Sequence, residues 1–269
     1  MVILDQAGRG RPWLRIVPAP PDVRDLVEHF WIEDSRGINT AHRGAWRIVP
    51  DGSAHLIFGT VEDECTVRYR LSVVGARTVQ TDIDRAGRVV TVGARLVPGA
   101  LPSLVREDAR HFADFGTPLL DLSPRLGRDA LERLTGAEDH ADLWRGLAAL
   151  VARMRRGAVL RQVTPIMNAV RLIDTSGGNA DIHRVAYEVG MAPRTFRATF
   201  AEQVGLAPKR YARIRRLHEA MHLTVGGSTR SLAGIASRTG YADQAHMTRD
   251  FRALVGEPPG AYLDRRVVS

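Results

Sequence analysis

The chain has 269 residues, enough for two domains with cores of their own, and its 44% hydrophobic and 25% charged residues exclude a largely disordered protein. No apolar run approaches the roughly 20 residues of a membrane span and no signal-peptide core is present, so we expect a cytoplasmic protein. The one cysteine, Cys65, excludes an intramolecular disulfide framework and a zinc site built on several thiolates.

The formal net charge of +8 is concentrated in the C-terminal part of the chain. Residues 1–160 hold 22 basic and 21 acidic side chains, whereas residues 161–269 hold 16 and 9. Such an asymmetry indicates that the C-terminal part faces a polyanion. All but one of the basic residues are arginines, in the nearly neutral part as well, which indicates genome composition rather than selection for phosphate binding.

The N-terminal part has the sequence pattern of a β-rich domain. Short β-like runs occur within residues 46–99, separated by glycine, proline and acidic turns. In one run the apolar Leu71 and Val73 flank the polar Ser72, as expected of a sheet with one solvated face. Helical patterns follow at 100–109, 128–134 and 139–155. We predict a barrel or sandwich, a cupin-like fold being one form of it, with packing helices. The last helix either closes the β domain or forms a dimer face.

The fold class predicted for the whole chain is α+β with two domains. A basic cluster that ends at Gly157 is typical of a linker. We place a β-rich effector-sensing and dimerisation domain at 1–157, a linker at 158–163, and an all-α domain at 164–269.

The C-terminal domain is predicted to be wholly helical. Its first four helices are expected at 164–176, 182–189, 193–203 and 208–224. Beyond them, Gly240 ends a short helix and Asp243 is placed to cap the next, whose apolar seam runs through Met247 and Phe251. Two short helices broken by a glycine turn are typical of a helix-turn-helix module.

This module occurs twice. Ile182, Ala186 and Gly190 recur 50 residues later, and Phe196, Phe200, Gly205, Pro208 and Tyr211 recur 51 residues later. Two copies cannot form a solenoid, so the period indicates a duplicated module with the helix at 208–224 as the connection between the copies.

The two copies resemble the AraC/XylS family of bacterial transcription regulators, through VAYEVGMAPRTFRATFAEQVGLAPKRY in the first and IASRTGYADQAHMTRDFRALVGEPPGAYL in the second. In the N-terminal part, HFW at 29–31 and RIVPDGSAHLIF at 47–58 look like the sensor-type domain of some of these regulators. The resemblance implies a regulator, commonly dimeric, that is not an enzyme and needs no cofactor. Its expected partners are double-stranded DNA, a small-molecule effector, RNA polymerase and a second copy of the chain.

The first recognition helix is expected to read bases through two arginines. With Phe196 and Phe200 inward, Arg194 and Arg197 face outward, and arginine pairs bidentately with guanine O6 and N7. The alternative is that these charges only solvate an exposed helix face. Two departures from the family pattern, Ala192 at the helix cap and Ala198 on the outer face, put the specificity of this module in doubt.

The second recognition helix is expected to read bases through Gln244, Thr248 and Arg249. These residues face outward when Met247 and Phe251 are inward, and glutamine suits adenine N6 and N7. Phosphate contacts are expected from four arginines of the connecting helix, which could instead pair with acids across the domain: Arg210, Arg213, Arg215 and Arg216.

The connecting helix also contains His218-Glu219-Ala220-Met221-His222, the H-E-x-x-H pattern of zinc metalloproteases. The longer form of that motif fails because Val225 occupies a position that requires glycine. We therefore interpret these residues as ordinary packing and surface residues and predict no metal site in the motif.

The effector site is the least determined feature. Trp31, Trp46 and His55 are candidates, although tryptophans in a β domain are more often core residues. A metal site of His42, His55 and His111 fits no tight motif. Two rival functions stay open: a constitutive DNA binder whose β domain only dimerises, and a β-barrel enzyme fused to a DNA module, like DNA-repair methyltransferases. Cys65 alone does not supply the thiol cluster of the latter.

Overall fold

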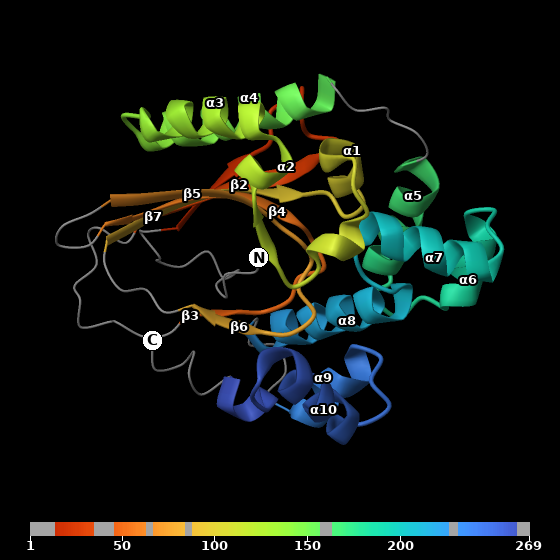
Figure 1. The fold of residues 1–269 in the computed structure, drawn as a ribbon. Helices are drawn as coiled ribbons and strands as arrows, with labels where there is room; N and C mark the ends of the chain where they lie inside the picture. The colour runs from red at the N-terminus through yellow and green to blue at the C-terminus, as the bar shows by residue number, and fades with distance from the viewer. Residues whose placement is uncertain are drawn as a thin grey trace.

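In the computed structural model, residues 14–34, 46–62, 67–83, 88–156, 163–225 and 231–262 are described. An N-terminal β-rich part packs against a C-terminal helical part (Figure 1). Among these residues, no helix is long and apolar enough to cross a membrane.

Six strands form one antiparallel sheet in the order β1-β2-β7-β4-β5-β8. They are β1 (Leu14–Pro18), β2 (Val27–Asp34), β4 (His55–Glu62), β5 (Val67–Val74), β7 (Arg88–Leu96) and β8 (Gly116–Pro118). Two further strands, β3 (Trp46–Ile48) and β6 (Thr81–Ile83), form a separate ribbon. The expected β-rich domain is therefore confirmed, and within the described residues its main sheet is open, with β1 and β8 at the edges.

One face of the sheet is covered by helices. The N-terminal helices are α1 (Leu101–Val105), η2 (Ala109–Phe112), α2 (Leu119–Leu122), α3 (Pro124–Thr135) and α4 (His140–Arg156). Figure 1 shows α3 and α4 lying along one side of the sheet. The stripe of α4, including Leu147 and Val151, is buried in the same core as Phe30 and Phe58 of the strands. The helix predicted at 139–155 therefore closes the β domain with its apolar stripe.

The C-terminal helices begin and end close to where the sequence predicts. They are α5 (Val163–Thr175), α6 (Ile182–Glu188), α7 (Pro193–Val204), α8 (Pro208–Val225), α9 (Leu232–Arg238) and α10 (Gln244–Val255). Asp181 and Asp243 cap α6 and α10, each accepting a hydrogen bond from a backbone N–H of the first turn. Ala192, at the same place before α7, provides no side-chain cap.

The two parts share a core. Val49 and Ala76 of the N-terminal part are buried in the cluster formed by α5 to α10. On the side of the sheet away from α4, α8 lies next to the β3–β6 ribbon (Figure 1). The linker predicted at 158–163 lies outside the described residues, except for Val163, which is the first residue of α5.

Candidate nucleic-acid interface

The recognition helix α7 has one buried and one exposed face. Phe196 and Phe200 are fully buried, and Phe200 packs edge-on against the Tyr211 ring of α8. Arg194 and Arg197 are exposed on the opposite face, as predicted. Because the aromatic seam fixes the rotation of α7, both guanidinium groups are available to an external partner.

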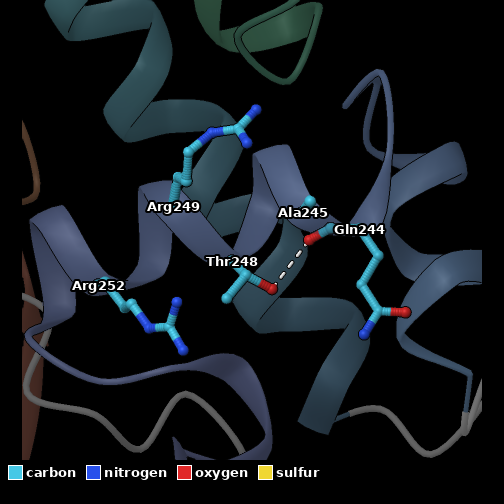
Figure 2. A pocket seen from close by; sticks show the side chains of 5 residues that line it. All are labelled: Gln244, Ala245, Thr248, Arg249 and Arg252. Carbon is cyan, nitrogen blue, oxygen red and sulfur yellow. Dashed lines mark hydrogen bonds between the residues drawn. The ribbon is translucent and has the colours of Figure 1, made fainter.

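The recognition helix α10 presents the corresponding surface of the second module. Met247 and Phe251 are fully buried, whereas Gln244 and Arg249 are exposed. Figure 2 shows the shallow groove that these side chains line together with Ala245, Thr248 and Arg252.

Two details of this groove go beyond the sequence prediction. The Thr248 hydroxyl donates to the Gln244 carbonyl oxygen at 2.8 Å, so a base would meet its methyl group or its oxygen lone pairs (Figure 2). Arg252 lines the groove but was not predicted. Its position one turn after Thr248 was the signal that could have found it.

The two modules carry their arginines at different positions along the recognition helix. Arg194 and Arg197 are the second and fifth residues of α7, whereas Arg249 and Arg252 are the sixth and ninth residues of α10. The positions of α7 that are equivalent to Arg249 and Arg252, 51 residues earlier, are both alanine. The modules therefore share a frame but present different cations to a partner.

The arginines of α8 that were predicted to bind phosphate are engaged within the protein. Arg210 Nη2 donates to the Thr78 carbonyl oxygen at 2.8 Å, and Arg213 Nε donates to Oδ1 of the buried Asp250 at 2.7 Å. The acid pairing considered as an alternative is thus present, and Arg213 holds α8 to α10.

The other two arginines of α8 are held in a similar way. Arg215 Nε lies 2.8 Å from Oδ1 of Asp174, and Arg216 Nη2 donates to the Gly178 carbonyl oxygen at 3.0 Å. The Arg216 guanidinium also lies over the Tyr241 ring. All four arginines are half-buried, so any phosphate contact would have to share or replace these partners. Their role in phosphate binding stays a prediction.

The H-E-x-x-H segment packs the two parts of the chain together. His218 is buried, and its Nε2 donates to the Pro50 carbonyl oxygen at 2.6 Å. Burial lowers the pKa of His218 to about 4, so this histidine is neutral at physiological pH. Glu219 and His222 are exposed, and no group of three or more metal-ligating side chains occurs among the described residues.

The effector candidates Trp31 and His55 lie on the sheet face away from α4. Trp31 is 2% exposed and its indole lies against Gly93 of the neighbouring strand. His55 is buried with Nε2 3.2 Å from Oδ2 of Asp51, and burial lowers its pKa to about 4. Both are packed interior side chains. Trp46 belongs to β3, but the structure does not describe its side chain. His42 and Cys65 lie outside the described residues.

A polar cleft of about 170 Å³ opens between the two parts of the chain. It is lined by Glu28 and Arg95 of the sheet and by Asp174, Gly177, Arg215, His218, Glu219 and His222 of the helical part. Arg95 Nε lies 3.1 Å from the Glu28 carboxylate. Burial raises the pKa of Glu28 and of Asp174, because it disfavours the charged form of each carboxyl group.

Comparison with known proteins agrees with this geometry. Residues 185–265 match a family described as "Helix-turn-helix domain", and residues 15–118 match a "Domain of unknown function (DUF6597)". Over 88 residues the chain is 35% identical to the HTH-type transcriptional regulator Rv1931c of Mycobacterium tuberculosis. That match covers 32% of this chain and spans only 33% of the length of the curated relative.

Among solved structures, ToxT of Vibrio cholerae is similar with a TM-score of 0.45 and 11% identity, over 87% of this chain and 97% of that chain. A ToxT structure bound to an unsaturated fatty acid gives a TM-score of 0.42 at 11% identity, over 82% and 91%. 

Residues 185–265 therefore belong to a helix-turn-helix domain, and an 88-residue stretch of the chain is similar to part of a transcription regulator. The two copies of the module in this domain are the part of the chain that resembles the AraC/XylS family.

Proposed function

We propose that the chain is a sequence-specific, DNA-binding transcription regulator whose two modules read adjacent major grooves. One observation carries this proposal. Each copy of a duplicated module buries the apolar seam of its recognition helix and exposes side chains that can pair with base edges.

The proposal gives each part of the interface a role. Arg194 and Arg197 of α7, and Gln244, Thr248 and Arg249 of α10, would read bases. Four half-buried arginines of α8 would position the domain against the DNA phosphates: Arg210, Arg213, Arg215 and Arg216. RNA polymerase and a second copy of the chain are the protein partners that this function calls for.

We further propose that the N-terminal part binds a small-molecule effector. The cleft between β2, β7 and α8 supports this, because its charged lining comes from both parts of the chain. A ligand there would contact the β-rich part and the connecting helix at the same time. Its occupancy could therefore favour one arrangement of the two parts over another.

The DNA-binding function can be tested with the full chain and a pool of randomised DNA duplexes. We expect the pool to converge on one sequence, with affinity at least about 10³-fold higher than for a scrambled duplex at physiological salt. Equal affinity for both duplexes would contradict sequence-specific binding.

The effector role needs a separate measurement. A panel of metabolites is screened for thermal stabilisation of the chain, and each stabilising compound is then tested for an altered affinity for the enriched duplex. If compounds stabilise the chain without altering that affinity, or none stabilises it, the constitutive regulator is the better description.

A further inference from the structure

The β-rich part touches both recognition helices at the same structural position. Gly205 ends α7 and Gly256 ends α10, and the two glycines are equivalent in the duplicated modules, 51 residues apart. Both have positive φ, +85° and +81°, as is usual for the glycine that follows a helix. Each of them lies against a different segment of the N-terminal part.

The contact at Gly205 is made by the backbone of η2. A Cβ atom at Gly205 would lie 3.0 Å from the Ala109 carbonyl oxygen, so the end of α7 lies close to the backbone of η2. Ala109 is itself buried. The end of the first recognition helix, α7, therefore packs against the β-rich part.

The contact at Gly256 is made by the Gln80 side chain. A Cβ atom at Gly256 would lie 2.6 Å from Nε2 of Gln80. Gln80 ends a stretch between β5 and β6, residues 76–80, that we name the bridging segment. Within it, Ala76 is buried in the C-terminal core, and the Thr78 carbonyl oxygen accepts the hydrogen bond from Arg210.

Asp114 holds the bridging segment in place through hydrogen bonds. Its carboxylate accepts hydrogen bonds from the Thr78 backbone N–H at 2.6 Å and from the Thr78 hydroxyl at 2.7 Å. Its own N–H donates to the Ala76 carbonyl oxygen at 3.2 Å. Asp114 has φ +64°, a conformation that costs energy outside glycine and marks a position constrained by its surroundings.

We propose that the bridging segment and η2 act together as a positioning element that sets the distance and angle between α7 and α10. Gln80 and Asp114 are its positioning residues. η2 and Asp114 are only a few residues apart in the chain, so the contact to the first module and the support of the contact to the second belong to one piece of backbone. The proposal deepens the DNA-reading function, since two modules can occupy adjacent grooves only at one relative placement.

The test measures the distance between the two helices in the full chain without DNA. Nitroxide labels are placed at Ala198→Cys and Ala253→Cys, both exposed positions, in a Cys65→Ser background that leaves no other thiol. Double electron–electron resonance then gives the distance distribution. Gln80→Ala and Asp114→Gly are introduced singly and together, with Val79→Ala, an exposed neighbour in the same segment, as the matched control.

We expect one narrow distribution in the background protein and in Val79→Ala, and a shifted or broadened one in Gln80→Ala and in the double variant. Asp114→Gly keeps the backbone conformation accessible, so its effect reports the lost carboxylate. Unchanged distributions in all variants would overturn the proposal. If the double variant does not fold, Gln80→Ala alone decides, because this change only shortens a partly exposed side chain.

A second measurement connects the placement to DNA reading. With the duplex enriched by the unlabelled wild-type chain, we expect Gln80→Ala to weaken binding by about fivefold or more, and Val79→Ala to leave it unchanged. A wild-type chain that enriches no duplex would refute the proposed function and leave the distance measurement valid. Altered distances with unaltered affinity would refute the role of the positioning element in reading.

Discussion

Single side chains decide what each module can contribute to specificity. Arg249 extends from a helix whose start is capped by Asp243, whereas Arg197 extends from α7, where Ala192 offers no cap. An arginine on a helix with a capped first turn loses less conformational entropy when its guanidinium group pairs with a base. We therefore expect α10 to supply the more specific contact.

The corresponding prediction compares Arg249→Ala with Arg197→Ala. Arg249→Ala should lower affinity for the enriched duplex by about 1–3 kcal/mol, and Arg197→Ala should lower it less. The measurement is binding to enriched and scrambled duplexes, with Arg145→Ala on α4 as an exposed control outside the interface. Equal losses for the two variants would contradict the ranking.

Local contacts of single side chains could be predicted from the sequence, whereas contacts between distant residues could not. The exposed side chains of α7 and α10 could be predicted, because the positions of Phe196 and Phe251 set the rotation of each helix. The partner of His218 could not, because Pro50 lies 168 residues away in the chain. A motif describes local spacing, and here it resembled a zinc site while the histidine packs one part of the chain against the other.

Among the elements, helix termini followed local chemistry. Aspartates, glycines and prolines marked the bounds of α6, α7 and α10 to within a residue or two. The strand order of the sheet was not accessible in this way, because β2 pairs with β7 across most of the domain. The role of α4 could not be predicted either, because its apolar stripe could pack equally well against a sheet or against a second helix.

The missing cap of α7 can be supplied. Ala192 has the extended backbone of an N-cap residue, φ −61° and ψ 140°, so a serine there could accept a hydrogen bond from the first turn. We expect Ala192→Ser to raise the free energy of unfolding by about 1 kcal/mol, measured by urea denaturation.

The matched control removes a cap that exists. Asp181 Oδ1 accepts a hydrogen bond from the His183 N–H at 2.8 Å, so Asp181→Ala should lower the free energy of unfolding by about the same 1 kcal/mol. No gain in Ala192→Ser beside a loss in Asp181→Ala would show that the start of α7 is already held by other contacts.

For the whole molecule, buried histidines make stability depend on pH. Burial lowers the pKa of His29, His55 and His218 to about 4, against about 6.5 in the unfolded chain. As the pH falls from 6.5 towards 4, the unfolded chain binds protons that the folded chain does not. The free energy of unfolding therefore falls by up to about 1.4 kcal/mol per pH unit for each of the buried His55 and His218, and by less for the partly exposed His29. The raised pKa values of Glu28 and Asp174 act in the opposite direction.

His218 isolates the part of this dependence that belongs to the contact between the two parts of the chain. In His218→Gln the side-chain amide can still donate to the Pro50 carbonyl oxygen but does not titrate. Urea denaturation at pH 6.5 and pH 5.5 should show a smaller loss of stability than in the wild type, by about 1 kcal/mol. An undiminished loss would mean that His218 is already protonated in the folded chain over this range.

The different side chains of α7 and α10 have a consequence for orientation. A protein with two identical recognition helices would contact the same bases through both modules. Here α7 offers Arg194 and Arg197, whereas α10 offers Gln244 at its start and Arg249 and Arg252 further along. A chain bound through both modules would therefore distinguish left from right along the duplex. Its site would be non-palindromic, and the β-rich part would always lie on the same side of it.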